Sequence, residues 1–342
     1  MLKIFGKMPS GQRLERIQQS PNYTNGSFQN VVPTEMMLKD ISYFKMMRMF
    51  FNKPKTVKPP KPLPSVRTDL HTINDDQPVI VWFGHSSYFI KHKGTSILID
   101  PVFSGNASPF SSSVKAFEGT NVYGVDDMPA IDMLILTHDH YDHLDYKTLL
   151  KLLPKVGHIY TSMGVGAHLE HWGIPHNKFT EFDWWQHNKI SDAISLTATP
   201  SRHFSGRLFK RGQSLWSAFI LELNGHKLFL GGDSGYDTTF KTIGEKYGPF
   251  DIAILECGQY GVHWPYIHMT PEQTVVAATD LNAKILLPIH WGKFALAFHD
   301  WDDSIKRVTA AAQTKGVPIT TPRIGEPVVL NTSYPDGRWW ED

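Results

Sequence analysis

Short apolar runs recur along the chain from about residue 78 onward, and most are too short for helices. Runs of this length, bounded by Gly, Pro, Asn or Ser, are typical of buried β-strands. Residues 78–101 contain three of them, separated by turns at 84–86 and 93–95. Further strands are expected within 131–137, 195–200, 216–223, 227–233, 251–257 and 283–290.

Three segments with helical spacing lie between or after these runs. Residues 145–153 form the first, and residues 302–315 form the last. The middle one, 270–281, opens with Thr270 as a cap and Pro271 in the first turn, which is a favoured helix start. Because strands alternate with covering helices in two successive halves, we expect an α/β fold built from packed layers.

The first 70 residues have a different texture. Residues 20–34 are polar and turn-rich, which predicts an extended arm. Residues 35–51 are apolar, Met-rich and basic, and favour an amphipathic helix. Residues 53–65 are Pro-rich and should be extended. The chain is therefore divided into an N-terminal arm, 1–70, and a folded domain, 71–342.

Charge separates the same two parts. The whole chain has a formal net charge of +1, with 41% apolar and 20% charged residues, as in ordinary globular proteins. Its first 70 residues contain 12 Lys or Arg against four acids, so the arm is about +8 and the remainder about −7. An acidic domain does not favour nucleic acid as a partner. A basic arm suits an anionic surface, such as a membrane or a phosphorylated ligand.

Cysteine content and hydropathy bear on the compartment. Cys257 is the single cysteine, so the chain has no disulfide framework of its own and no Cys-rich zinc site. No run approaches 18 apolar residues, and the apolar stretch at the N-terminus is too short for a signal peptide. We expect a cytoplasmic protein with peripheral contact to a membrane.

The segment ILTHDHYDHLD, residues 135–145, carries the strongest chemical signal. It follows a predicted strand and contains His138, His140, Asp142 and His143. Imidazole nitrogens and carboxylate oxygens are the usual ligands of zinc. Four ligands in so short a loop cannot all reach one ion without strain, whereas two ions about 3.5–4 Å apart can share them.

Three later residues extend this ligand set. His203, Asp233 and His290 each follow an apolar run, where a strand would deliver them to the edge of a sheet. Neighbouring glycines would let the backbone approach closely at this edge. The pattern therefore predicts an open site with seven ligands for two metal ions.

These motifs resemble a known family. HDHYDH is similar to the HxHxDH signature of the metallo-β-lactamase superfamily, whose members fold as a four-layer αββα sandwich, and the later His, Asp and His follow in the same order. The resemblance implies an α/β sandwich of this kind carrying two zinc ions (Zn²⁺). One ion would be held by His138, His140 and His203, the other by Asp142, His143 and His290, with Asp233 bridging both.

A narrower resemblance covers residues 78–303, and weakly 21–34. WFGHSSYFI, ILIDPVFS, PSRHFSGR, HMTPEQTV and IHWGKFALAFHD are similar to N-acylphosphatidylethanolamine-hydrolysing phospholipase D and its bacterial relatives. It implies that a hydroxide bridging the zinc ions cleaves a phosphodiester in a phospholipid, giving N-acylethanolamine and phosphatidic acid. It also implies a homodimer.

Other candidate residues carry two interpretations each. Asp142 would orient the nucleophile or carry a proton, besides binding metal. Asp100 would accept a proton from a ligand imidazole, or is a turn residue before a proline. By resemblance His268 lines the substrate site, or it is a surface histidine. Lys293 would attract a phosphate at the site mouth, or is solvated. Tyr260 would contact substrate, or simply packs.

His85, in the motif WFGHSS, is interpreted as a structural residue.

The helix predicted at 35–51 has three interpretations. It would lie on a bilayer, cap the domain or form a dimer contact.

Several alternative functions remain open. The same metal site would serve a lactonase or another ester hydrolase acting on a small molecule. A nuclease would want a basic groove, but the domain is acidic. A diiron redox or metal-binding protein is a further alternative, although diiron relatives replace a ligand of the His-rich loop with a carboxylate. His140 is intact here, which favours zinc.

Overall fold

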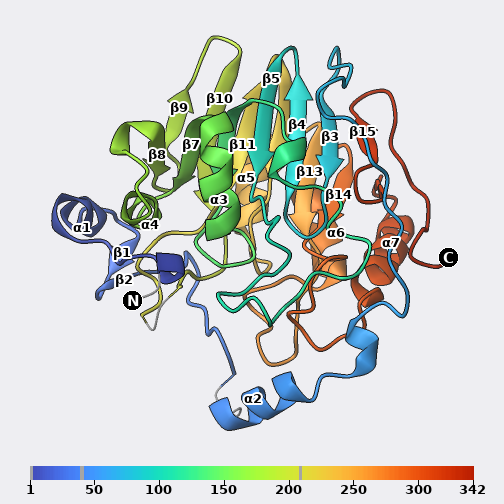
Figure 1. Cartoon of the computed structure of the whole chain (residues 1–342), viewed down its shortest axis with the longest axis horizontal. Coiled ribbons are helices and arrows are strands. Elements are labelled where there is room, and N and C mark those ends of the chain that lie inside the picture. Colours follow the sequence, from blue (N-terminus) through green and yellow to red (C-terminus); the bar gives the residue numbers. More distant parts are fainter. Residues whose placement is uncertain (1–2, 39–41, 208–209) are drawn as a thin grey trace.

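Two β-sheets form the centre of the chain in the computed structural model, which describes residues 3–38, 42–207 and 210–342 (Figure 1). Within these ranges the larger sheet has seven strands and the smaller has six. In spatial order the larger holds β15 (Pro327–Val329), β3 (Val79–Trp82), β4 (Tyr88–His92), β5 (Thr95–Ile99), β6 (Ile131–Leu136), β7 (Val156–Ser162) and β8 (Phe179–Phe182). The smaller holds β14 (Leu286–Ile289), β13 (Ile252–Glu256), β12 (His226–Leu230), β11 (Ser217–Leu223), β10 (Ile194–Pro200) and β9 (His187–Lys189).

Both sheets are mixed. Strands β5 to β8 run parallel to one another, as do β12 to β14, whereas the remaining neighbours are antiparallel. The C-terminal ends of the parallel strands are where ligands bind in open α/β sheets. The predicted strand runs of the sequence all form strands, with boundaries shifted by a few residues.

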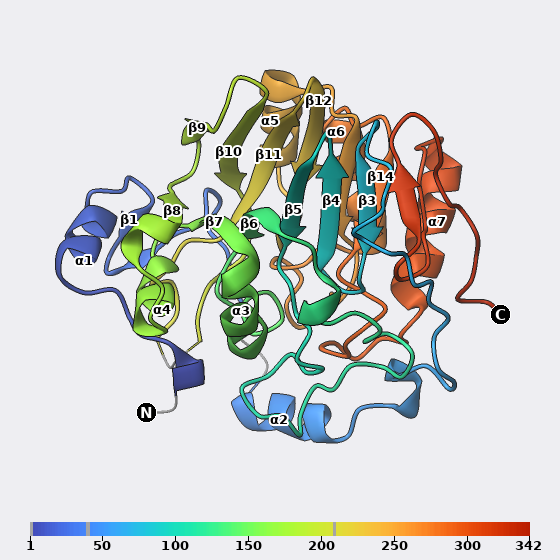
Figure 2. The same cartoon turned by 45° about the horizontal axis from the view of Figure 1, so that its top comes forward.

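Helices cover the outer face of each sheet (Figures 1 and 2). The larger sheet is covered by α3 (Tyr146–Leu152) and α4 (Gly166–His171), and the smaller by α5 (Thr239–Tyr247), α6 (Pro271–Asp280) and α7 (Asp303–Lys315). Short 3₁₀ turns are η1 (Lys3–Phe5), η2 (Lys55–Val57), η3 (Val125–Asp127), η4 (Leu153–Lys155) and η5 (His176–Lys178). The four layers confirm the predicted αββα arrangement.

Successive side chains of the central strands point to opposite faces of their sheet, and this alternation produces the layers. On β5, Ile97 and Ile99 enter the core between the sheets, and Leu98 enters the core beneath α3 and α4. Because successive side chains of a strand point to opposite faces, a strand that is apolar throughout is buried on both sides. Each fully buried aliphatic side chain contributes about 1.5–3 kcal/mol, so the two cores fix the strand ends firmly.

Two predicted helices begin and end as their sequences indicate. Thr270 caps α6 through a reciprocal capping box with Gln273. α7 ends at Gly316, whose left-handed φ of 66° suits glycine. The pattern of apolar residues did not predict α4, α5, β7 or β8, because His, Gly and Thr residues interrupt the apolar periodicity of these segments.

The N-terminal 70 residues differ from the expectation in two places. Residues 20–34 contain a small hairpin, β1 (Tyr23–Thr24) with β2 (Ser27–Phe28), and α1 (Gly11–Gln18) precedes it. The helix expected at 35–51 is shorter: α2 spans Tyr43–Phe51, and residues 35–38 are not helical. Residues 39–41 of that prediction lie outside the described residues. A tertiary bond from Leu38 N to His263 O, 3.0 Å long, holds the preceding segment against another loop instead.

α2 projects from the end of the sandwich opposite β9 and β10 (Figure 1). Ser42 caps it by accepting a bond from Lys45 N. In the described part of the chain, no helix combines the length and apolar character needed to cross a bilayer.

Candidate metal centre

The seven predicted ligands converge at one end of the sandwich. Four follow β6, and single residues follow β10, β12 and β14, so every ligand leaves the C-terminal end of a strand. Among the described residues, three groups have ligand atoms that lie within 4.8 Å of one another. The first group is His138, His140, His203 and Asp233, the second is His85, Asp142, His143 and His290, and the third is Asp233, His268 and His290, which shares one residue with each of the others.

In the first group, three imidazoles present nitrogen atoms to one another. His138 Nε2 lies 2.9 Å from His140 Nδ1, which lies 3.2 Å from His203 Nε2. Asp233 Oδ2 is 3.7 Å from His203 Nε2 and 3.9 Å from His138 Nε2. Burial lowers the pKa of all three histidines, so they are neutral at pH 7. Neutral nitrogens and a carboxylate gathered at one point form a donor set that fits a divalent zinc ion.

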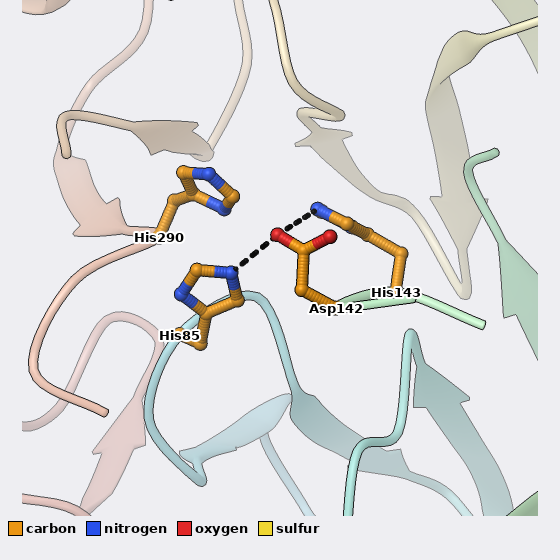
Figure 3. Close-up of side chains that lie close together, drawn as sticks. All are labelled: His85, Asp142, His143 and His290. Atoms are coloured by element: carbon orange, nitrogen blue, oxygen red, sulfur yellow. Dashed lines mark hydrogen bonds and ion pairs between the residues drawn. The ribbon is translucent and has the colours of Figure 1, made fainter. Parts of the chain in front are cut away.

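In the second group, Asp142 lies between two imidazoles (Figure 3). Its Oδ2 is 2.9 Å from His85 Nε2 and 3.6 Å from His143 Nε2. Burial opposes charge on Asp142, but His143 and His85 hold its pKa well below the ordinary value. His290 Nε2 is buried and has no hydrogen-bond partner among the described residues, so this nitrogen is available to a metal.

Asp233 connects the two groups. Its Oδ2 is 3.1 Å from His143 Nε2, and its Oδ1 is 3.2 Å from His290 Nδ1. The same carboxylate faces the first group, so it is placed as a residue shared by two ions would be. The structure therefore brings together all seven residues that the sequence singled out.

His85 and His290 hold each other through their backbones. His290 N donates to His85 O (2.9 Å), and His85 N donates to Trp291 O (2.9 Å). Both residues have left-handed φ angles, 53° for His85 and 67° for His290, which is costly for residues other than glycine. Strain of this kind persists only where surrounding contacts impose it. The backbone of His85 thus holds His290 in place, and its imidazole also joins the second group.

Asp100 fixes the orientation of His143. Its Oδ2 accepts from His143 Nδ1 (2.8 Å) and Thr137 Oγ1 (2.6 Å), and its Oδ1 accepts from Thr137 N (2.9 Å). With Nδ1 engaged in this way, His143 directs Nε2 toward the aspartates of the centre. A carboxylate behind a ligand imidazole is the common arrangement at zinc sites.

His268 lies beside the second group with a partner that sequence reasoning missed. Glu256, the last residue of β13, accepts from His268 Nδ1 at 3.0 Å and from Met269 N at 3.0 Å. Burial opposes charge on His268, but the Glu256 carboxylate raises its pKa to about 9; burial raises the pKa of Glu256 to about 7. The ring of His268 is 5.2 Å from that of His290. Glu256 ends an apolar run as the ligands do, a signal that could have revealed it.

Lys293 does not lie at the site mouth, so that expectation is wrong. Its side chain is 1% exposed, and its Nζ donates to Phe83 O and Val102 O, both at 3.1 Å. Burial lowers the pKa of Lys293 to about 7. Its amine instead ties together the two loops that carry His85 and Asp100.

Tyr260 has a hydroxyl that is already engaged by α7. It donates to Asp303 and accepts from Arg307 Nη1 at 3.1 Å, and its ring stacks on His299 with centroids 4.3 Å apart. These contacts give Tyr260 a packing role against α7.

The chain is similar to known proteins over much of its length. A family model described as "Beta-lactamase superfamily domain" matches residues 95–291. An uncharacterized protein of Mycobacterium tuberculosis is 34% identical over 330 residues, covering 94% of this chain and 88% of that protein. N-acyl-phosphatidylethanolamine-hydrolyzing phospholipase D 1 of Caenorhabditis elegans is 30% identical, covering 63% of this chain and 64% of its own. A metal-dependent hydrolase of Pyrobaculum neutrophilum is 28% identical, covering 69% and 94%.

Solved structures share the fold at low sequence identity. A metallo hydrolase from Ignicoccus hospitalis superposes with a TM-score of 0.58 at 19% identity, covering 75% of this chain and all of its own. A diiron β-hydroxylase from Streptomyces venezuelae superposes with a TM-score of 0.57 at 20% identity, covering 75% of this chain and 55% of that one.

Proposed function

The chain belongs to the metallo-β-lactamase superfamily and is a metal-dependent hydrolase, and on this premise we propose that it uses two zinc ions to hydrolyse a phosphodiester. The proposed substrate is a phospholipid of the N-acylphosphatidylethanolamine type, cleaved to N-acylethanolamine and phosphatidic acid. The observation that carries the two-ion assignment is the position of Asp233, which faces both groups of ligands.

Each ion would have its own triad besides this shared carboxylate. One triad is His138, His140 and His203, and the other is Asp142, His143 and His290. Zinc bound in such a site lowers the pKa of water to near neutrality and neutralises charge on phosphoryl oxygens.

The chain's own residues would then orient and move protons. Asp142 engages His85 through Oδ2, which leaves Oδ1 to orient an attacking water. His268 is held at Nδ1 by Glu256, which leaves Nε2 to contact an oxygen of the substrate. In this proposal His268 binds the phosphoryl group or supplies a proton to the leaving oxygen.

The exposed aromatic residues and basic residues of α2 support the proposal of a lipid substrate. Phe44 is 72% exposed and Phe51 is 81% exposed, while Lys45 and Arg48 lie on the same helix. An amphipathic helix with this composition binds the interface of an anionic bilayer.

The loops beside α2 extend the same surface. Lys53 Nζ donates to Ala295 O at 2.8 Å, and the loop contacted by Leu38 presents Val262, which is 77% exposed. Both loops follow strands of the metal centre, β13 and β14. A bilayer contacted by α2 would therefore lie on the side of the molecule that carries the loops after β13 and β14.

A substrate screen tests the proposed reaction. Purified protein loaded with zinc is assayed on N-acylphosphatidylethanolamine in vesicles, on bis(4-nitrophenyl) phosphate and on a simple lactone, each with and without EDTA. We expect both phosphodiesters to be cleaved, phosphatidic acid to appear by mass spectrometry, and EDTA to abolish both reactions. Lactone turnover with intact phosphodiesters would establish the esterase alternative instead. Stoichiometric iron in protein that hydrolyses none of the three would point to the diiron alternative.

The membrane role of α2 predicts a selective loss. The double variant Phe44→Ser/Phe51→Ser removes two exposed apolar side chains, each worth about 1.5 kcal/mol or more when buried in a bilayer. We expect at least about tenfold weaker binding to anionic vesicles and a similar loss of lipid hydrolysis, with bis(4-nitrophenyl) phosphate hydrolysis unchanged. Phe44→Leu/Phe51→Leu is the matched control and should keep most of the binding. Equal vesicle binding by all three proteins would assign α2 to another contact.

A further inference from the structure

Asn30 lies between β2 and α2 and contacts a residue of the metal centre far away in the sequence. Its Nδ2 donates to His203 O at 2.8 Å, and its Oδ1 accepts from His203 N at 3.0 Å. One side-chain amide therefore satisfies both backbone groups of His203. A neighbouring strand would normally supply this pair of bonds.

His203 needs such a partner because it lies beyond the end of β10. Its ring is fixed at the other nitrogen, where Nδ1 donates to Ile267 O at 2.8 Å. These contacts direct Nε2 toward His140 Nδ1, 3.2 Å away, and toward Asp233. Asn30 sets the backbone from which the imidazole projects, and Ile267 sets the rotation of the ring.

Asn30 is itself held in place. Its Oδ1 also accepts from Trp216 Nε1 at 3.1 Å, and Phe28 N donates to Gly212 O at 2.8 Å. Phe28 packs with Trp216 in a small buried cluster. Trp216, which bonds to the Asn30 side chain, and Phe28, two residues before Asn30, therefore belong to the same buried cluster. This packing leaves the Asn30 amide little freedom to move away from His203.

We propose that Asn30 is a positioning residue for His203, so that the N-terminal segment completes the metal centre. The proposal rests on the proposed function in one respect, namely that His203 is a metal ligand. Loss of a group that orients a ligand costs about 10–100-fold in metal affinity. Asn30→Ala should therefore weaken metal binding although residue 30 touches no metal.

The test compares Asn30→Ala with Asn22→Ala in the whole chain of 342 residues. Asn22 lies beside the same hairpin, but its Nδ2 donates to Asp183 Oδ1 at 2.8 Å and not to His203. Zinc affinity is measured by competition with a chromophoric chelator, and folding by circular dichroism. We expect about 10–100-fold weaker binding of one zinc equivalent in Asn30→Ala and a change of less than about twofold in Asn22→Ala.

A third variant and a kinetic measurement separate positioning from a general structural role. Asn30→Asp keeps the shape of the side chain and the acceptor for His203 N, but it sets a second acceptor against His203 O in place of the donor, so we expect a zinc affinity at least as weak as that of Asn30→Ala. With saturating zinc, the kcat of Asn30→Ala should recover in part while KM stays near that of the unaltered protein. Wild-type zinc affinity in Asn30→Ala, or equal losses in Asn30→Ala and Asn22→Ala, would overturn the proposal.

His203→Ala is the reference variant, and its metal content can be read without any substrate. We expect it to lose one zinc equivalent. Full retention of both ions by His203→Ala would overturn the ligand assignment in the proposed function, and the Asn30 proposal with it. Loss of zinc by His203→Ala, with no loss in Asn30→Ala, would overturn the Asn30 proposal alone.

Discussion

Asp233→Asn should lower kcat/KM for phosphodiester hydrolysis at least about 10³-fold and release metal from both groups. Removal of one neutral hydrogen-bond donor at a reacting oxygen costs about 10²–10³-fold, and Asp233 would contribute a full charge to both proposed metal sites. Its carboxylate is buried, but His143 and His290 hold its pKa well below the ordinary value. An asparagine keeps the shape of the side chain and loses the charge that two cations would share.

Metal analysis by plasma mass spectrometry, together with kcat/KM, checks this result. Asp192→Asn is the matched control, because the Asp192 side chain is fully exposed and pairs with Lys189 on the surface. It should retain both metal and activity. Near-normal turnover by Asp233→Asn, with its metal content intact, would contradict the assignment of Asp233 as the shared ligand.

Arg207→Ala should lower the free energy of unfolding by about 3–5 kcal/mol. The Arg207 guanidinium is buried, donating to Asp139 O at 2.8 Å, Leu144 O at 2.7 Å and Ile4 O at 2.9 Å. Each carbonyl left without a partner costs about 1–3 kcal/mol. The guanidinium also lies over the Tyr141 ring, 4.1 Å from its centroid, so its removal loses packing as well.

Urea denaturation followed by circular dichroism measures this loss. Arg211→Ala is the control, since Arg211 lies on the same loop but is exposed. It should change the free energy of unfolding by less than about 0.5 kcal/mol. Because Asp139 and Leu144 lie within the His-rich loop, beside His138 and His143, Arg207→Ala should also weaken metal binding. A destabilisation no larger than that of Arg211→Ala would contradict the role of Arg207 in joining the N-terminus to that loop.

The candidate metal ligands, which the structure brings together, could be selected from sequence because their signal is local. A ligand-type residue directly after an apolar run marks the end of a strand, and parallel strand ends meet at one edge. His203, Asp233 and His290 were found in this way, although they are far apart in the chain. Asp100 was visible for the same reason, since it follows the run at 95–99.

Residues whose roles depend on distant backbone groups could not be predicted. Lysine is almost never fully buried, so Lys293 was expected in solvent. Only the folded chain shows the two carbonyls, 210 and 191 residues away in sequence, that accept its bonds. Asn30 is hidden for the same reason, because its partner His203 lies 173 residues away.

The predicted start of the helix at residue 35 was wrong for a related reason. Met36 and Met37 continue the apolar pattern of α2, so the sequence favoured a helix from residue 35. The backbone bond from Leu38 to His263 holds that segment in another conformation. Local propensity is a weak guide wherever a tertiary contact competes with it.

The distribution of ligands between the sheets has a mechanical consequence. The His-rich loop extends from β6 of the larger sheet, whereas His203, Asp233 and His290 extend from strands of the smaller one. Metal ions bound by residues of both sheets would hold the two sheets together. Any ligand that binds only the folded state stabilises it in proportion to the logarithm of its concentration. The zinc supply would then regulate the free energy of unfolding of the protein as well as its chemistry.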